Sequence, residues 1–274
     1  GEVKTSVDKV SLPLTEAEQD WIAEHPVISV AGDYAWAPFE FRNDQGLHDG
    51  LGHDILQQVS YLTGLQFHYT TDVWEKSLEQ VKNKEKDVVV AAFKTKEREA
   101  YLLFSKPYVS ALNYFFVRSS DKVERLGQLA GKRLAIIKDS ARAEEISQLI
   151  PNLTLVYVES PEQAIDYVVS GQADFLYDSH AVINYILNYR SITEISAFKS
   201  IPNSPVNNLH VGVRDDYAPL VEIINKALVY LENHNMQQLM DKWLGANRLT
   251  PDDIAIVLSD EERQWLDAHP QMTF

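Results

Sequence analysis

Arg98 is the side chain best placed in this sequence to hold an anionic group. Thr95, three residues earlier, is predicted to cap a short helix that carries Arg98. A guanidinium beside the unpaired N–H groups of a helix start can hold a carboxylate through two parallel hydrogen bonds. The alternative is an arginine exposed on a helix surface with no ligand.

A second group of candidate residues follows the first predicted strand, residues 27–30. Asp33, Tyr34 and Trp36 come directly after it. A carboxylate there could orient a ligand, and an aromatic ring could stack on a ligand cation. For Trp36 the alternative is packing in the core or in a loop.

Enzyme signatures are weak. The sequence has no Gly-x-Ser-x-Gly, no phosphate-binding loop and no His-Glu-x-x-His. Ser119 and Lys122 match Ser-x-x-Lys in a polar turn, where chance is the better account. His48 and His53, on either side of Asp49, are interpreted as part of a solvated loop rather than as metal ligands.

The composition excludes several classes of protein. The chain has 274 residues, 45% of them hydrophobic, which is enough for one large domain or two moderate ones. Its 25 Lys and Arg against 40 Asp and Glu give a net charge of −15, which repels a phosphate backbone. We therefore expect no nucleic-acid partner.

Cysteine is absent, which excludes disulfides, thiolate metal sites and cysteine nucleophiles. A chain without thiols suits an oxidising compartment, although cytosolic proteins can also lack cysteine. The strongest apolar run, Val88–Phe93, is far shorter than a membrane-spanning helix requires. Residues 1–10 are charged and lack the apolar centre of a signal peptide.

An internal repeat is the most informative feature of the sequence. Residues 14–30 align without gaps on residues 258–274, with Leu, Glu, Trp, His and Pro at matching positions. Each copy carries a capping box, Thr15 with Glu18 and Ser259 with Glu262, which predicts a short helix that His-Pro ends before a strand. Two unrelated capped helices are the alternative. The repeat predicts that residues 258–274 open a second domain of the same kind.

Strands and helices are predicted to alternate along the chain, a pattern typical of α/β sheets with right-handed crossovers. Gly64 is expected to end the second helix and Gly245 the last one. The strands are predicted at 27–30, 65–69, 88–92, 134–137, 154–158 and 173–177, and the helices at 52–63, 74–82, 141–149, 161–170, 180–188 and 218–243.

In this order, several short motifs resemble those of the bacterial family 3 solute-binding proteins. The resemblance covers roughly residues 25–248. Within it, the chain is most similar to the tandem sensor modules of hybrid histidine kinases, in which a comparable acidic leader precedes each module. The motifs are Gly32-Asp33-x-x-Trp36-x-Pro38-Phe39, Gly52-x-Asp54, Asp87, Thr95-x-x-Arg98, Phe104-Ser105-x-Pro107-Tyr108, Gly131-Lys132-Arg133-Leu134, Gly171-Gln172-Ala173-Asp174 and Lys242-Trp243-Leu244.

The resemblance implies an α/β fold of the type II periplasmic-binding (Venus-flytrap) class. Each of its two lobes is a sheet flanked by helices, and ligand binds in the cleft between them. Two hinge crossings are expected, near 109–112 and 201–208. The implied domains are a leader with a capped helix (1–26), a first lobe (27–108 with 209–248), a second lobe (113–201), and a linker with the start of a truncated repeat (249–274).

The resemblance also assigns roles to candidate residues. It places a ligand α-carboxylate on Arg98 and a ligand ammonium on Asp178, which follows the strand predicted at 173–177. For Asp178 the alternative is an N-cap of the helix from His180. The full set of predicted ligand-binding residues is Arg98, Asp178, Asp33, Trp36, Tyr34, Phe93, Ser140 and Thr95.

Two departures from the family pattern weaken the prediction of a free amino acid. Where many amino-acid receptors have small hydroxyl residues, residues 91–94 read Ala-Ala-Phe-Lys, so Phe93 could line a more apolar pocket. Where the second lobe usually has a Gly-Ser/Thr turn, residues 138–141 read Lys-Asp-Ser-Ala, and Asp139 would repel an anion unless Lys138 or Arg142 compensates. A module that binds nothing and acts through protein contacts is the alternative.

Three functions are compatible with these features. The favoured one is a periplasmic sensory module of an inner-membrane signalling protein. It would bind a small amino-acid-like or carboxylate solute and would need no cofactor or metal. Its partners would be the following repeat and the membrane-anchored signalling domains, with a homodimer left open. A solute receptor of an amino-acid transporter is the second function. A dehydratase-like enzyme is the third, and only Asp33, Asp139 and Asp178 could serve it as acid or base.

Overall fold

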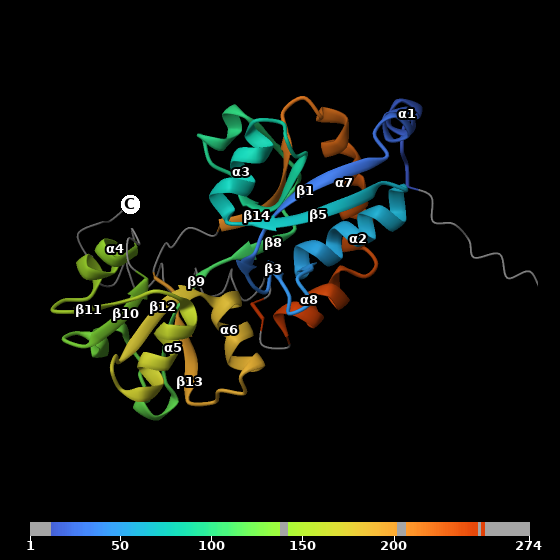
Figure 1. The fold of residues 1–274 in the computed structure, drawn as a ribbon. Helices are drawn as coiled ribbons and strands as arrows, with labels where there is room; N and C mark the ends of the chain where they lie inside the picture. Colours follow the sequence, from blue (N-terminus) through green and yellow to red (C-terminus); the bar gives the residue numbers. More distant parts are fainter. Residues whose placement is uncertain (1–11, 138–141, 202–206, 246–247, 250–274) are drawn as a thin grey trace, which may run out of the picture. The chain divides into compact units, whose positions relative to one another are not determined.

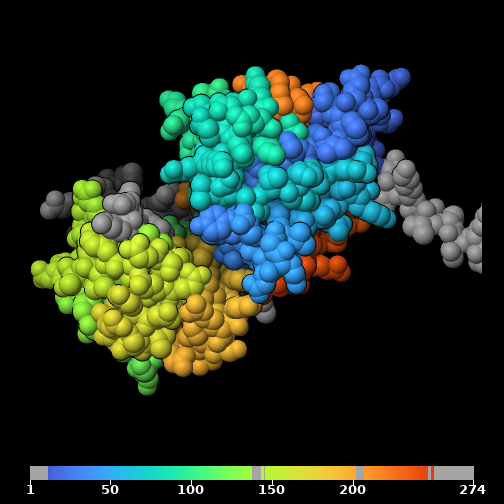
Figure 2. Space-filling view, in the orientation of Figure 1, coloured from blue at the N-terminus to red at the C-terminus, as the bar shows by residue number. Residues whose placement is uncertain are grey.

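The computed structural model describes residues 12–137, 142–201, 207–245 and 248–249. These residues divide into two compact units. The first comprises the described part of Gly1–Ser110 together with Asn208–Trp243, and the second the described parts of Ala111–Asn207 and Leu244–Phe274. Figure 2 shows the first unit as a mixture of blue-to-cyan and orange-to-red surface, because it is built from segments far apart in the sequence.

The first unit holds the leader helix, a large sheet and a small three-stranded sheet. Its elements are α1 (Glu16–Glu24), β1 (Val27–Asp33), β2 (Ala35–Trp36), β3 (Glu40–Arg42), β4 (His48–Asp49), α2 (Leu51–Thr63), β5 (Gln66–Asp72), α3 (Trp74–Lys82), β6 (Val88–Phe93), the 3-10 helix η1 (Arg98–Ala100), β7 (Leu102–Phe104), β8 (Val109–Ala111), β14 (Asn207–Arg214), α7 (Ala218–Glu232) and α8 (Met236–Leu244).

The large sheet has the strand order β5-β1-β6-β14-β7, with β8 also paired to β14. Strands β5, β1 and β6 are parallel, and β14 runs antiparallel to β6 and β7. Since the chain passes from β1 to β5 through α2 and returns past β1 to β6 through α3, right-handed crossovers place these helices on opposite faces. Figure 1 shows α3 and α2 on the two sides of the sheet. The carboxyl ends of β1, β5 and β6 therefore meet at one edge.

Local sequence signals set several of these boundaries. The Thr15–Glu18 capping box predicted for the leader is present at the start of α1. Gly64 caps α2 with a left-handed backbone (φ 82°), as predicted. The second copy of the capping box, Ser259 with Glu262, lies outside the described residues.

The helix predicted at 218–243 is two helices, α7 and α8. The break follows Glu232, where polar side chains take the carbonyls that a continuous helix would use. Asn233 Nδ2 donates to the Val229 carbonyl at 2.9 Å, and His234 Nδ1 contacts the Tyr230 carbonyl at 2.7 Å. The apolar periodicity continues across the break, so it did not reveal this local competition.

The second unit is built around a five-stranded sheet of order β11-β10-β12-β9-β13. Phe115 and Phe175 are fully buried in its core. Its elements are β9 (Asn113–Arg118), η2 (Ser119–Asp121), η3 (Leu126–Leu129), β10 (Arg133–Ile137), α4 (Arg142–Leu149), β11 (Thr154–Val158), α5 (Pro161–Ser170), β12 (Phe175–Ser179), α6 (His180–Tyr189) and β13 (Ile195–Lys199). None of the helices in the described part of the chain combines the length and apolarity needed to cross a membrane.

Candidate functional site

A pocket of about 290 Å³ in the first unit gathers four of the residues predicted to bind ligand. It lies where β1 and β6 end and η1 begins. The general rule that open α/β sheets bind ligands at the carboxyl ends of their strands selects the same edge. The lining residues are Asp33, Trp36, Trp74, Ala91, Phe93 and Arg98.

Arg98 is half-buried and has no carboxylate within ion-pair distance among the described residues. Its Nη1 donates to the Phe93 carbonyl at 2.9 Å, and its guanidinium carbon lies 5.4 Å from the centre of the Trp74 ring. These two contacts orient the guanidinium but leave its charge uncompensated. The remaining N–H donors suit a ligand carboxylate.

The predicted helix around Arg98 is wrong in detail. Arg98 is the first residue of the 3-10 helix η1 rather than a residue inside an α-helix. Thr95 still supports it as expected, because Thr95 Oγ1 accepts the backbone N–H of Arg98 at 3.2 Å. Thr95 therefore positions Arg98 without lining the pocket itself.

Asp33 supplies the acidic side of the pocket. Its Oδ1 accepts the Ala35 N–H at 3.0 Å, and its own backbone N–H donates to Glu40 Oε1 at 2.9 Å. Burial raises the pKa of the Asp33 carboxyl, partly offset by the Ala35 N–H. Asp33 and Arg98 thus offer opposite charges to one small ligand.

Aromatic rings form the apolar part of the pocket. Trp36 packs edge-on against Phe93, with ring centres 5.6 Å apart, and against Phe39 at 4.8 Å. Trp36 therefore packs against other rings and also lines the pocket, and its stacking on a ligand stays a prediction. Trp74 was not predicted as a site residue. It could have been, because it follows the carboxyl end of β5, and Asp33 lies at the carboxyl end of the neighbouring strand β1.

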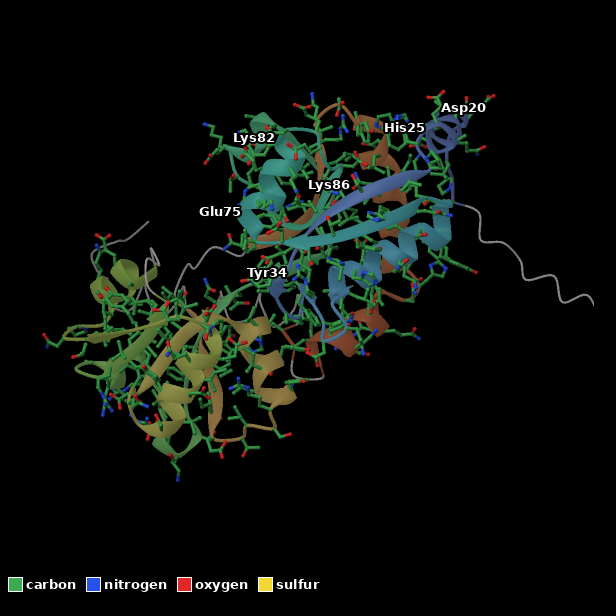
Figure 3. All side chains as sticks on the ribbon, viewed as in Figure 1. Asp20, His25, Tyr34, Glu75, Lys82 and Lys86 are labelled. Carbon is green, nitrogen blue, oxygen red and sulfur yellow. The ribbon has the colours of Figure 1, made fainter. Side chains whose placement is uncertain are left out.

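Tyr34 lies outside the pocket lining. Its side chain is 45% exposed, and the Arg42 guanidinium carbon lies 6.0 Å from its ring centre. Figure 3 shows Tyr34 and His25 at opposite ends of β1, so Tyr34 is at the same end of the strand as the pocket. A contact between Tyr34 and ligand stays a prediction.

Asp178 is the predicted ligand-binding residue that lies in the second unit. Asp178 is buried in β12, not after the strand, and its Oδ1 accepts the Ser179 N–H at 2.7 Å. The alternative that Asp178 caps α6 is wrong, because Ser179 is the N-cap and its Oγ accepts the Val182 N–H. Ser140, like Lys138 and Asp139, lies outside the described residues.

The interpretation of His48 and His53 as part of a solvated loop is wrong. His48 is only 6% exposed. Its Nδ1 lies 3.0 Å from Nδ1 of His53, and its Nε2 lies 3.0 Å from Glu40 Oε1. No group of three or more potential metal ligands was found in the described part of the chain.

Several residues of the family motifs hold the fold together instead of lining the pocket. Asp54 Oδ2 accepts both Lys242 Nζ at 2.7 Å and Trp243 Nε1 at 2.8 Å, which ties α2 to α8. Asp174 accepts hydrogen bonds from Arg133 and Arg118 in the second unit. These motifs therefore identify the fold more directly than they identify a ligand.

The family assignment agrees with this fold and this pocket. Residues 28–246 match the family model of the bacterial extracellular solute-binding proteins, family 3, and the chain belongs to that family.

The most similar curated relatives include two sensor proteins. The chain is 28% identical over 245 residues to the virulence sensor protein BvgS of Bordetella pertussis, and 24% identical over 242 residues to the sensor protein EvgS of Escherichia coli K12. Each alignment covers 88% of this chain but only 20% of the relative. A transporter protein of Escherichia coli K12, ABC transporter arginine-binding protein 1, is 21% identical over 211 residues, covering 76% of this chain and 86% of the relative.

Solved structures place the fold in the Venus-flytrap class that the sequence predicted. The periplasmic VFT2 domain of Bordetella pertussis BvgS matches with a TM-score of 0.69 and 25% identity, over 85% of this chain and 99% of that domain. The second substrate-binding domain of Lactococcus lactis GlnP, in an open conformation, matches with a TM-score of 0.70 and 21% identity, over 81% and 97%. The latter similarity shows the fold alone.

Proposed function

We propose that this chain is the extracytoplasmic ligand-binding domain of a membrane sensor histidine kinase, and that it binds a small amino-acid-like or carboxylate solute. The similarity to BvgS and EvgS supports the sensor role. The chain spans about a fifth of the length of those relatives, as one module of a longer protein would. The following repeat, the membrane anchor and the kinase domain are part of the proposal, as are a periplasmic location and possible homodimers.

The main observation in favour of a ligand with a carboxylate is that the Arg98 guanidinium has no carboxylate partner within ion-pair distance among the described residues. The guanidinium lies beside an aromatic ring and a backbone carbonyl, so it is poised for an anionic group of a ligand. Asp33 across the same lining would take an ammonium, and Trp36 and Phe93 would contact the apolar part. An amino acid combines these three features.

The similarity to sensor and solute-binding proteins favours binding over catalysis in this segment. A dehydratase-like reaction would need an acid or base in the pocket, and Asp33 is the one titratable acid among the lining residues. We infer a binding module, and incubation with prephenate-like and amino-acid substrates should return them unchanged. The appearance of product would favour the enzyme.

A thermal-shift panel tests the proposed function. The melting temperature would be measured with each of the L-amino acids, small carboxylates and amines. A ligand at about 100 times its dissociation constant should add roughly 2.7 kcal/mol of stability, a shift of a few degrees. We expect a shift for ligands with a carboxylate and its absence for the matching amides. A flat response across the panel would favour a module that acts through protein contacts alone.

A transporter receptor is the second candidate, supported by the similarity to arginine-binding protein 1. Ligand binding alone does not separate it from a sensor. The complete gene does: a second repeat followed by a membrane span and a kinase domain would support the sensor, whereas a gene without signalling domains would support the receptor.

A further inference from the structure

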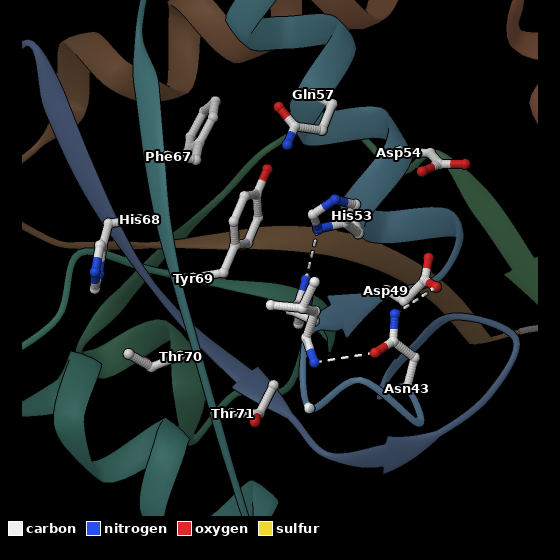
Figure 4. A pocket seen from close by; sticks show the side chains of 13 residues that line it. Asn43, Asp49, His53, Asp54, Gln57, Phe67, His68, Tyr69, Thr70 and Thr71 are labelled. Atoms are coloured by element: carbon white, nitrogen blue, oxygen red, sulfur yellow. Dashed lines mark hydrogen bonds between the residues drawn. The ribbon is translucent and has the colours of Figure 1, made fainter.

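A chain of hydrogen bonds in the first unit ends at Asp33. Glu40 Oε1 accepts the Asp33 N–H at 2.9 Å and lies 3.0 Å from His48 Nε2. His48 Nδ1 lies 3.0 Å from Nδ1 of His53. His53 lines a second pocket of about 570 Å³, in which Figure 4 shows it beside Tyr69. The chain thus runs from this second pocket to the ligand-binding pocket.

The middle of this hydrogen-bonded chain is buried. Glu40 is fully buried, and the His48 side chain is 1% exposed. The Tyr69 ring stacks on His48 at 5.0 Å and 12°. Gly32 leaves room for the imidazole, because a Cβ there would lie 2.6 Å from His48 Cδ2. The imidazole therefore has little freedom to change its partners.

Glu40 makes both of its described hydrogen bonds through one oxygen. Its Oε2 is buried and has no partner among the described residues. A buried polar atom without a partner costs free energy, so the fold retains this glutamate at a cost in stability. Glu40 accepts the Asp33 N–H, and this contact offers a reason for keeping a buried glutamate. Asp33 lines the pocket, and the position of the Asp33 backbone determines where the Asp33 carboxylate points.

We propose that Glu40, His48 and His53 are positioning residues that fix Asp33 in its ligand-binding orientation and make that orientation depend on the proton held by the histidine pair. The proposal rests on the proposed function for the role of Asp33. The hydrogen-bonded chain itself can be tested without a ligand.

The Nδ1-to-Nδ1 contact explains the dependence on protons. One of the two nitrogens must be unprotonated to accept the hydrogen bond, so the pair can carry only one imidazolium. A second proton would set two N–H groups against each other and break the chain.

Other charged groups surround the two ends of the chain. His53 faces Asp54, Asp49 and Lys242 besides His48, and burial followed by the His48 charge lowers its pKa. Glu40 faces His48 and Asp33, and Tyr108 lies close enough for its pKa to be raised further by the Glu40 charge. Acidification that adds the second proton should therefore break the contact between His48 and His53 and loosen the chain of hydrogen bonds that holds Asp33.

Nuclear magnetic resonance provides the test. The backbone amide shift of residue 33 and the His53 ring signals would be followed from pH 8 down to about pH 4, because the pKa of His53 is lowered. An Asp33→Asn background removes the titration of the Asp33 carboxyl itself. We expect the amide to titrate with the midpoint of His53 and to stop doing so in His53→Gln. His68→Gln, an exposed histidine of β5, is the matched control and should leave the titration in place.

Two results would overturn the proposal: an Asp33 amide that does not respond to pH, or one that titrates unchanged in His53→Gln. Because Glu40→Gln could fail to fold, the half-exposed His53 carries the decision. With L-arginine and L-histidine as probes, His53→Gln should also weaken binding by about tenfold, the effect of one lost hydrogen bond, whereas His68→Gln should not. If no member of the thermal-shift panel binds even the unaltered protein, the proposed function fails while the amide titration still decides the role of the hydrogen-bonded chain.

Discussion

Arg98 differs from Arg118, Arg133 and Arg214 in the partners of its guanidinium. Arg118 and Arg133 share Asp174, and Arg214 pairs with Asp87 and Asp216. Arg98 has instead a carbonyl and an aromatic ring. Arg42 also has no carboxylate within ion-pair distance among the described residues, but its guanidinium donates to Thr71 and does not line the pocket, so Arg98 is the candidate for ligand binding.

His180 should make the protein less stable in mild acid. It is 7% exposed beside Tyr114 and Phe116, and burial lowers its pKa from 6.5 to about 4. Between these values the unfolded chain binds a proton that the folded chain does not, so the free energy of unfolding falls as the pH falls through this window. The loss should approach about 3 kcal/mol at pH 4.

Denaturant unfolding at several pH values measures this effect. His180→Phe should flatten the dependence between pH 6.5 and pH 4, whereas His68→Gln should leave it unchanged. An equally steep acid dependence in His180→Phe would mean that other groups cause it.

Asp174 should contribute more to the free energy of unfolding than an exposed carboxylate does. It is held by Arg133 and Arg118, and although burial opposes it, hydrogen bonds from these residues keep its pKa well below the usual range. Asp174→Asn should cost about 2 to 3 kcal/mol of unfolding free energy, because two arginines lose their charged partner. Asp166→Asn, at an exposed pair with Arg190, should cost under about 0.5 kcal/mol. Similar losses for both would contradict this ranking.

At the scale of elements, α2 packs directly on the large sheet through Gly52. A Cβ at this position would lie 2.3 Å from Val90 Cγ1 of β6, a buried residue. We expect Gly52→Ala to lower the free energy of unfolding by about 1 to 3 kcal/mol, because the core there has no space for a methyl group. Chemical denaturation would measure the loss.

Two variants separate this clash from other effects of alanine. Gly127→Ala, where a Cβ meets no atom within 4 Å, should be near neutral. Adding Val90→Ala to Gly52→Ala should cost less than the sum of the two single changes, since it removes the clashing methyl group. Additive losses would show that Gly52 is needed for another reason.

The sequence predicted most elements because their boundaries follow local rules. The helices α3 and α5 and the strand β11 have the predicted bounds, and Gly64 ends α2 as expected. The break between α7 and α8 was missed, because Asn233 and His234 end the helix through side-chain hydrogen bonds that hydrophobic periodicity does not register.

The site was predictable to the extent that parallel strands bring their carboxyl ends together. Asp33 and Phe93 end neighbouring parallel strands, and Arg98 follows the second of them. Glu40 was not predicted, because a charged residue between Phe39 and Phe41 reads as a surface position until its partners are known. Its contacts with Asp33 and His48 depend on the folding of β3 and β4 against β1.

At the scale of the whole molecule, the family motifs and the ligand chemistry are carried by different residues. Asp54, Asp87 and Asp174 form ties that any member with this fold could use. The pocket lining of Trp36, Trp74 and Phe93 is more apolar than the hydroxyl-rich pattern of many amino-acid receptors. We therefore expect the ligand to be an amino-acid-like solute with a substantial apolar part.

Calorimetric titration of the unaltered protein and of Arg98→Ala is the most direct test of the account. The probe would be the carboxylate that gives the largest thermal shift, with its amide and the exposed-surface variant Arg190→Ala as controls. We predict that Arg98→Ala reduces affinity at least about a hundredfold, because a charge-assisted contact at a half-buried arginine is lost, and that Arg190→Ala does not. Undiminished affinity in Arg98→Ala would contradict the central claim, because the carboxylate would then be held by other residues.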